Sequence, residues 1–399
     1  MTILSPAPVC LRHARAGAAA AFAAQGLCFI SLTTRLPRLQ DRWDLSEVAT
    51  SGFLLMVVLL AGAGSVGAEW IARHRHSDWT LRLGLVLLGL GLGGVALAPD
   101  LWVFVATLAV YAVGLGLVDA STNMQAVAVE HRYGRPILPS FHGAWTAGGI
   151  AATLIAIAVA HLSLAQSLLP VVIVPVLVAL FAPLLPAVTA NGTGTETTGG
   201  TTRAADDPAA LPWRRITVLG IAMVLFYMVD SAATTWGPIY LDSTFAAPER
   251  FLPLATLPYL VATLSARLAG DRMVARFGAV PQLRLGGIVA AGALAVIVFA
   301  PSWPVAVLGF TVLGAAVAVI APLSFSAAAT LAGEAVDPII RQARVDAVIA
   351  RFNQFNYVGA LLGAVMTGLV GAGSLRVGFA VPMILILAII PLAKAFRTP

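Results

Sequence analysis

Two carboxylates lie well inside long apolar stretches of the sequence. They are Asp119 and Asp230, whereas the other acids fall in polar segments or near the ends of apolar ones. A carboxylate at the centre of a membrane helix costs at least about 2.5–3.5 kcal/mol on insertion scales, so it should face a cavity or a partner. Because burial disfavours the charged form, such a group can load and release a proton. We therefore predict proton coupling at Asp119 and Asp230, with Asp119 the stronger candidate.

Each of these carboxylates has an alternative interpretation. Asp119 could hydrogen-bond neighbouring helices through Ser121 or Thr122 and never titrate. Asp230 could instead bind a hydroxyl of a solute.

Glu130 and His142 form a second candidate pair for proton coupling. His142 opens an apolar stretch, within reach of Glu130 at the end of the preceding one. The ordinary pKa of histidine suits a proton relay. The alternative is that His142 only hydrogen-bonds the end of that preceding helix.

Neutral amides, hydroxyls and amphipathic aromatic rings inside the apolar stretches are candidates for solute binding. Asn123 lies one turn after Asp119, and Asn353 shares a helix face with Asn356. The alternative is packing between helices or at the membrane interface, and we expect about a third of the set to line a site. The set is Asn123, Gln125, Trp145, Trp236, Tyr240, Ser326, Asn353, Asn356 and Tyr357.

The sequence has no pattern typical of an enzyme. It lacks a Walker Gly-x-x-x-x-Gly-Lys-Ser/Thr motif, metal-ligand Cys/His spacing and a serine-elbow motif. We predict that Cys10 and Cys28 are free thiols. We expect no enzymatic activity, no metal and no cofactor, and a proton gradient as the energy source.

The elements that hold these residues follow from the composition. The chain has 399 residues, of which 59% are hydrophobic and 11% charged, against roughly 25% charged in a soluble domain. This excludes an ordinary cytosolic enzyme and a disordered scaffold, and the net charge of +6 is interpreted as an orientation signal, not a nucleic-acid surface. Long apolar runs, without alternation, argue against an outer-membrane barrel. The composition predicts an all-α polytopic membrane protein.

Twelve stretches are long enough to span a bilayer, which takes about 20 residues. With the N-terminus in the cytoplasm, 19 of the 24 Lys and Arg fall in inner segments, so both termini are predicted to be cytoplasmic. The predicted spans are 17–34, 48–68, 81–98, 101–126, 141–161, 166–186, 216–241, 252–268, 284–300, 303–327, 347–371 and 377–395.

A polar, Gly/Thr-rich stretch at 187–214 divides the chain into two halves of six spans each. It is predicted to be a flexible cytoplasmic linker. We predict an N-terminal six-helix bundle over 1–186 and a C-terminal bundle over 215–399.

Near the eleventh span, Arg351 is interpreted as an inner-surface charge, with Asp346 as an available partner.

The loop after the eighth span reads RLAGDRMVARFG over residues 267–278. It resembles the cytoplasmic signature of the major facilitator superfamily, and the matching segment of the first half, 67–76, is degenerate. The resemblance implies two six-helix bundles and a gate at which Gly270 allows close helix approach and Asp271 pairs with nearby arginines such as Arg276. The alternative is that these arginines serve topology and lipid headgroup contact.

More of the chain resembles one bacterial inner-membrane subgroup of that superfamily, the YbjJ-like proteins, which are distantly similar to fucose–proton symporters. Arg35 belongs to an Arg-x-Pro element of this subgroup, which implies an outer gate, whereas the alternative is snorkelling to headgroups. Thr235 stands where members often carry an acid, and Ala364 follows Gly363 where they often carry prolines. The resembling stretches are 35–37, 119–123, 129–130, 141–145, 230–236, 240–241, 309–310, 322–328 and 357–359.

Together these observations predict a secondary active transporter that works by alternating access. We expect proton-coupled symport of a small, neutral, sugar-like metabolite across the bacterial inner membrane, by a monomer that binds no nucleic acid. The alternative is a proton-driven efflux antiporter for a drug, antibiotic or metabolite. A non-transporting sensor would need a soluble domain, which the sequence does not show.

Overall fold

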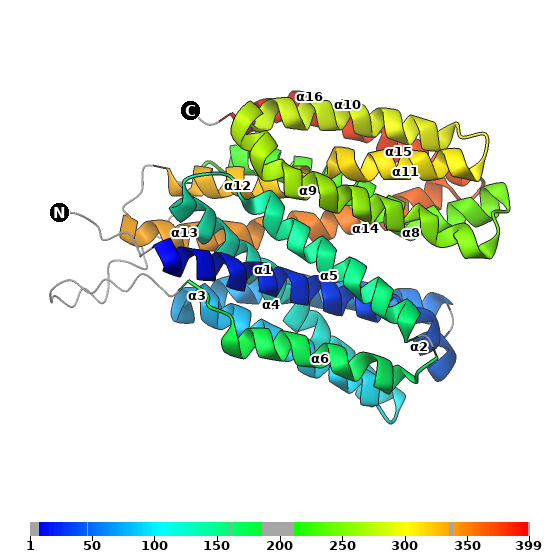
Figure 1. The fold of residues 1–399 in the computed structure, drawn as a ribbon, viewed down its shortest axis with the longest axis horizontal. Helices are drawn as coiled ribbons and strands as arrows, with labels where there is room; N and C mark the ends of the chain where they lie inside the picture. The colour runs from blue at the N-terminus through cyan, green and yellow to red at the C-terminus, as the bar shows by residue number, and fades with distance from the viewer. Residues whose placement is uncertain (1–7, 46, 160, 186–210, 335–337, 398–399) are drawn as a thin grey trace. The chain divides into compact units, whose positions relative to one another are not determined.

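A computed structural model describes residues 8–45, 47–159, 161–185, 211–334 and 338–397, and its regular structure is helical (Figure 1). The first half contains α1 (Pro8–Thr33), α2 (Leu36–Trp43), α3 (Glu47–Leu97), α4 (Leu101–Tyr133), α5 (Leu138–Ala158) and α6 (Leu164–Phe181). The second half contains α8 (Trp213–Phe245), the 3₁₀ helix η2 (Glu249–Ala255), α9 (Leu257–Phe277), α10 (Ala279–Val298), α11 (Trp303–Val317), α12 (Ile320–Gly333), α13 (Pro338–Phe352), α14 (Gln354–Val370), α15 (Leu375–Leu385), η3 (Ile386–Ala388), α16 (Ile389–Leu392) and η4 (Ala393–Phe396).

Eleven stretches of described helix are long and apolar enough to cross a membrane. Each overlaps one of the predicted spans; for example, Leu101–Tyr133 contains the span predicted at 101–126. The remaining prediction, 347–371, falls on the end of α13 and on α14, which has 17 residues and is at the short end of what can cross a bilayer. The predicted all-α polytopic architecture is confirmed, whereas the cytoplasmic placement of the termini stays a prediction.

The ends of the spans carry the expected capping chemistry. Asp100 precedes α4 and its carboxylate accepts a hydrogen bond from the Val103 amide at 2.9 Å, while Gly134 ends the helix with φ = 65°. Ser163 and Gln166 form a capping box at the start of α6. These contacts satisfy backbone N–H and C=O groups that have no partner within their own helix.

The second and third predicted spans both lie in α3, which is kinked between them. His76 has φ = 67° and ψ = 161°, which is not helical. A positive φ is uncommon for a residue with a Cβ. It separates the two spans at the position where the sequence predicted a polar loop.

Contacts group the chain into two compact units. Unit 1 consists of Met1–Arg135, Ala144–Leu211 and Ala332–Asn353, and unit 2 of Pro136–Gly143, Pro212–Leu331 and Gln354–Pro399. Each unit therefore takes most of one half of the chain and a short segment of the other. Residues 186–210, which include most of the predicted linker, lie outside the described residues, so the predicted domain boundaries stay predictions.

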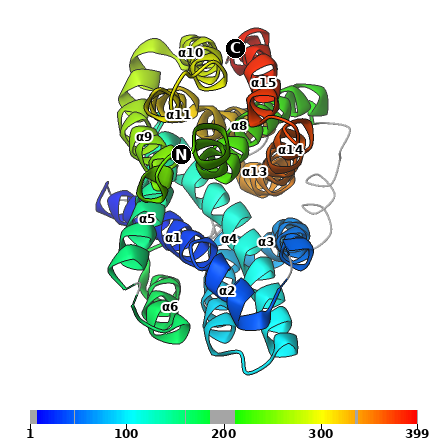
Figure 2. The same cartoon turned by 90° about the vertical axis from the view of Figure 1, so that its right-hand side faces the viewer.

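Within each unit the helices run side by side, and Figure 2 shows them nearly end on. In unit 1, α1 and α3 both pack against α4 and α6, and α13 packs against α3 and α4. In unit 2, α8 packs against α14, and α11 packs against α9 and α10.

Small residues set the closest of these approaches. A Cβ at Gly116 of α4 would lie only 1.9 Å from the Ala61 carbonyl oxygen of α3. At Gly26 of α1 it would lie 2.1 Å from the Trp145 carbonyl oxygen of α5. Glycine is needed at both positions because the facing atom is backbone and cannot swing away.

Three arginines bind the carbonyl groups at helix C-termini. Arg42 donates to carbonyls at the end of α3, Arg82 to those at the end of α6, and Arg376 to those at the end of α10. These carbonyls have no partner within their own helix, and the helix dipole makes this end negative. These three of the 24 Lys and Arg therefore have a structural use.

The glycine contacts predict opposite effects for two alanine substitutions. Gly116→Ala should destabilise the protein by about 1–3 kcal/mol, because the added methyl group overlaps a backbone carbonyl. Gly292→Ala in α10, where a Cβ would meet nothing within 4 Å, should be neutral or raise stability by up to about 1 kcal/mol. Thermal unfolding of the detergent-solubilised variants measures both, and equal behaviour of the two would refute the close α3–α4 approach.

Candidate functional site

Asp119 lies in the middle of α4 and binds two amide side chains from other helices of unit 1. Its Oδ1 accepts a hydrogen bond from Gln25 Nε2 of α1 at 2.9 Å. Its Oδ2 accepts one from Asn353 Nδ2, at the interruption between α13 and α14, at 2.7 Å. Gln25 and Asn353 are both buried. Two N–H donors on two carboxylate oxygens stabilise the ionised form of this carboxyl.

Three amide oxygens around Asp119 have no hydrogen-bond donor among the described residues. They are Gln25 Oε1, Asn123 Oδ1 and Asn353 Oδ1, all on buried side chains. The Asn123 Nδ2 group is used on the backbone oxygen of Asp119 at 2.8 Å. The Asp119 cluster, Gln25, Asp119, Asn123 and Asn353, therefore presents more acceptors than donors, which suits a proton or another hydrogen-bond donor.

Asp119 is joined to neighbouring helices by residues other than Ser121 and Thr122, the nearby hydroxyls in the sequence. Ser121 donates to the Leu117 carbonyl at 2.5 Å, and Thr122 donates to the Val118 carbonyl at 2.8 Å. Both hydroxyls thus bond their own helix. Asp119 does join neighbouring helices, but through amides contributed by α1 and by the α13–α14 interruption.

The segment around Asn353 also bonds α3. Ser65 Oγ donates to the Ala350 carbonyl at 3.2 Å, and Asn353 Nδ2 lies 3.3 Å from Ser65 Oγ. One helical turn further along α3, Glu69 accepts two hydrogen bonds from Arg351, at 2.7 and 2.9 Å. The end of α13 is thus fixed to α3 at three successive contacts.

The partner expected for Arg351 was wrong. Arg351 pairs with Glu69, whereas Asp346 Oδ1 accepts from Gln342 Nε2 at 2.8 Å, within α13. The helical spacing explains this, because five residues separate Asp346 from Arg351 and place them on different faces.

Asp230 occupies a simpler site in α8 of unit 2. Its Oδ1 accepts a hydrogen bond from the Tyr259 hydroxyl of α9 at 2.6 Å. Thr234, one turn later, donates to the backbone oxygen of Asp230 and not to its carboxylate. A phenol can reverse its role from donor to acceptor, so this pair can also adjust to a protonated carboxyl.

The signature loop places Gly270 and Asp271 against the start of α5, within unit 2. Asp271 Oδ1 accepts a hydrogen bond from the Ser140 backbone amide at 2.9 Å, where the helix dipole favours an anion. A Cβ at Gly270 would lie 2.9 Å from Pro139 Cβ. Arg276 is exposed and lies over the Phe277 ring, 5.2 Å from its centroid.

His142 follows directly in α5 and is buried against α9 and α12. Its ring stacks on Phe325 with centroids 6.0 Å apart, and its carbonyl accepts from Arg267 Nη1 at 3.2 Å. Glu130 is buried near the end of α4, in the other unit. A relay between Glu130 and His142 therefore stays a prediction.

Three of the predicted solute ligands have their polar groups engaged inside the protein. The Gln125 amide bonds Ser77 and the Leu185 backbone. Trp236 Nε1 donates to the Ala364 carbonyl at 2.9 Å. Tyr240 is fully buried and donates to the Ile297 carbonyl at 2.7 Å. These contacts are those expected of packing residues.

The other predicted ligands differ in position. Asn123 and Asn353 belong to the Asp119 cluster. Trp145 is half-buried beside Phe29, with ring centroids 6.1 Å apart. In unit 2, Ser326, Asn356 and Tyr357 are each half-buried.

Arg35 lies at the junction of α1 and α2 and is buried, not extended along the helix surface. It donates to the Ser31 carbonyl at 2.9 Å and to Ser167 Oγ of α6 at 3.0 Å. Its guanidinium thus ties the ends of α1 and α6 together.

The described residues contain no group of three or more His, Cys, Asp or Glu side chains that could hold a metal ion.

Comparison with solved structures identifies the fold. The chain superposes on the fucose:proton symporter of E. coli with a TM-score of 0.72 at 16% identity, covering 96% of this chain and 98% of that one. The chain has the major facilitator fold. It also matches a proton:xylose symporter (TM-score 0.71, 14% identity, 96% and 94% covered) and the human organic anion transporter MFSD10 (0.74, 13%, 96% and 99%).

Sequence comparison points the same way. An uncharacterized MFS-type transporter of Yersinia pestis is 25% identical over 94% of both chains. An uncharacterized transporter of Sinorhizobium fredii is 24% identical over 91% of this chain and 93% of its own length. No model of a known protein family matches the chain. These relatives and structural neighbours are transporters and not enzymes, and the chain is a multi-pass membrane protein like them. The narrower YbjJ-like assignment stays a prediction.

Several residues of the site were not among the sequence-based candidates. Gln25 is the one strongly polar side chain in an alanine-rich stretch, which was a usable signal. Arg267 and Glu69 sit at the ends of predicted spans, where polar residues are common, so their types alone carry little information. Tyr259 lies in the middle of the span predicted at 252–268, but an aromatic residue there is also expected of helix packing.

The Glu69–Arg351 pair predicts a measurable coupling. Removing either charge should lower the free energy of unfolding by about 1 kcal/mol, since the pair is bidentate but the Arg351 side chain is 42% exposed. A double-mutant cycle with Glu69→Gln and Arg351→Gln, followed by thermal unfolding in detergent, should give a coupling energy of about 0.5–1 kcal/mol. Additive effects would mean that the α3–α13 contact does not depend on this pair.

Proposed function

We propose that the chain is a secondary active transporter that moves a small polar, sugar-like solute across the bacterial cytoplasmic membrane by alternating access, in symport with protons that bind Asp119. The observation that carries this proposal is the Asp119 cluster, in which one carboxylate meets two amides whose oxygens accept no hydrogen bond from the described part of the chain. The fucose:proton and proton:xylose symporters, which share the fold, support the choice of symport. The transporter acts as a monomer without a cofactor.

The two amides can satisfy Asp119 in both protonation states. When the carboxyl is ionised, Gln25 and Asn353 each donate an N–H to it. When it is protonated, its O–H becomes a donor and needs an acceptor. Rotation of either amide by half a turn presents an oxygen in place of the NH₂ group, because the two ends of an amide are nearly the same size. Neither state leaves the carboxyl without a hydrogen-bond partner.

Asn353 links this proton site to a larger element. It lies at the interruption between α13 and α14 and is flanked by the contacts of Ala350 and Arg351 with α3. A change in the Asn353 amide alters its bond to Ser65 as well as its bond to Asp119. Proton loading thereby acts on the attachment of α13 to α3.

The remaining polar groups are assigned secondary roles in the proposal. Asp230, with Tyr259, is a second titrating group or a ligand for a solute hydroxyl. Gly270 and Asp271 form a gate contact at the start of α5, and Arg276 adds positive charge beside it. The solute ligands are drawn from Asn123, Trp145, Ser326, Asn356 and Tyr357, whereas Gln125, Trp236 and Tyr240 serve packing.

Replacing Asp119 should separate proton movement from solute movement. In proteoliposomes with an internal pH dye, fucose or xylose should drive proton uptake by the wild type. In Asp119→Asn this proton uptake should fall to background, while exchange of labelled sugar persists, because asparagine resembles the protonated carboxyl. Asp242→Asn, an exposed acid at the end of α8, is the matched control and should change neither. Sugar-driven proton uptake by Asp119→Asn would exclude Asp119 as the proton carrier, and proton movement in the opposite sense would indicate export.

Asn353 and Asn356 form a second matched pair. Asn353→Ala removes a donor to the carboxylate and should move the midpoint of the pH dependence of uptake upward by about one unit, since a hydrogen bond to a charged group contributes about 1.5–3 kcal/mol. Asn356→Ala should alter affinity for the sugar without moving that midpoint. Uptake assays across a pH series compare the two, and an unmoved midpoint in Asn353→Ala would remove Asn353 from the proton site.

A further inference from the structure

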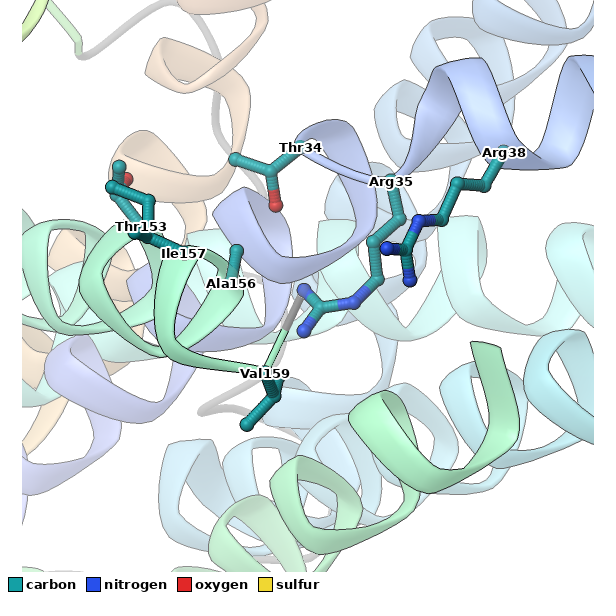
Figure 3. A pocket seen from close by; sticks show the side chains of 7 residues that line it. All are labelled: Thr34, Arg35, Arg38, Thr153, Ala156, Ile157 and Val159. Atoms are coloured by element: carbon teal, nitrogen blue, oxygen red, sulfur yellow. The ribbon is translucent and has the colours of Figure 1, made fainter. Parts of the chain in front are cut away.

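A cavity of about 310 Å³ opens between the α1–α2 junction and the last turns of α5, within unit 1 (Figure 3). Thr34, Arg35 and Arg38 line one side of it, and Ala156, Ile157 and Val159 line the other. It therefore combines two guanidinium groups with an aliphatic wall. This arrangement does not belong to the Asp119 cluster.

The two guanidinium groups point into the same space. Figure 3 shows the side chains of Arg35 and Arg38 extending side by side toward the cavity. Burial, together with the positive charge of Arg38, lowers the pKa of Arg35. An arginine nevertheless stays protonated in proteins, so two like charges face one cavity.

Arg35 is only 3% exposed, and the hydrogen bonds that the described part of the chain gives it all go to neutral acceptors. These are the Ser31 carbonyl at 2.9 Å, Ser167 Oγ at 3.0 Å and the Ser167 carbonyl at 3.2 Å. Carbonyl and hydroxyl groups satisfy its N–H donors without cancelling its charge. A buried charge without a counter-charge is costly, and an anion in the cavity would relieve that cost.

Helix capping alone does not explain this arrangement. Arg42, seven residues beyond Arg35, also donates to backbone carbonyls, at the end of α3. Arg42 is exposed and does not line the cavity. Its guanidinium lies over the Trp43 ring, 4.9 Å from the ring centroid, so a capping arginine of the same segment need not face the cavity.

We propose that this cavity is a binding site for an organic anion, whose carboxylate or phosphate group is held by Arg35 and Arg38 and whose short apolar part packs on Ala156, Ile157 and Val159. Guanidinium groups bind both oxyanions through paired N–H donors. The volume is at the lower end of the range for small-molecule sites, which is about 300–1,000 Å³. The Thr34 and Thr153 hydroxyls donate to their own helices, so the arginines supply the recognition. The anion comes either from a soluble molecule or from an anionic lipid headgroup.

Binding of inorganic phosphate to the detergent-solubilised protein tests the site. Titration calorimetry in a chloride-free buffer should show saturable binding to the wild type. Arg38→Gln, at a half-buried position, should raise the Kd about tenfold, as expected for one lost charge-assisted contact. Arg42→Gln should leave the Kd unchanged. Arg35→Lys keeps a charge but not the paired donors, and should weaken binding less than Arg38→Gln.

A second arm distinguishes the two sources of the anion. The titration is repeated in nanodiscs of phosphatidylcholine and in nanodiscs that contain phosphatidylglycerol. Unchanged phosphate binding in both supports a soluble anion, whereas loss of binding as phosphatidylglycerol is added supports a headgroup. The proposal is overturned if phosphate does not bind in detergent, or if Arg42→Gln weakens binding as much as Arg38→Gln does. Neither result bears on proton coupling, because the site shares no residue with the Asp119 cluster.

Discussion

An ionised carboxylate inside a membrane-spanning helix needs hydrogen-bond donors, because the hydrocarbon around the protein supplies none. Asp119 meets this requirement through Gln25 and Asn353, one amide on each carboxylate oxygen. Three segments that are far apart in the sequence must therefore meet at one point: the middle of α1, the middle of α4 and the junction of α13 with α14. The packing of α1, α4 and the end of α13 within unit 1 is what brings these three segments together.

The glycines of unit 1 show how the meeting is made possible. Gly26 is adjacent to Gln25, and its lack of a side chain lets α1 approach the backbone of α5. Gly116 lies three residues before Asp119 and lets α4 approach α3 in the same way. The bonds of Ser65 and Glu69 to the end of α13 then place Asn353 within reach of Asp119. Close backbone packing thus positions the polar groups, and the polar groups fix which helices meet.

The sequence was most informative where one-dimensional patterns are enough. Apolar run length gave the spans, and the carboxylate inside one run drew attention to Asp119. The partners of Asp119 were not predictable, because Gln25 and Asn353 lie 94 and 234 residues away and no local pattern links them. Residue type also misled in part: Tyr240 and Gln125 have the polar groups of a solute ligand, but these groups are used on neighbouring backbone. Likewise, proximity in sequence suggested Asp346 for Arg351, whereas helix packing brings Glu69 to it.

The central claim is that Asp119 changes its protonation state and that its two amides respond. Infrared difference spectroscopy of the protein in lipid, recorded across a pH titration, tests this directly and needs no knowledge of the solute. We expect a band from a protonated carboxyl that disappears as the pH rises, that is absent in Asp119→Asn, and whose frequency shifts in Gln25→Ala and Asn353→Ala. Amide bands of Gln25 and Asn353 should change together with it. If every titrating carboxyl band of the wild type persisted unaltered in Asp119→Asn, with no band lost, the account would be contradicted.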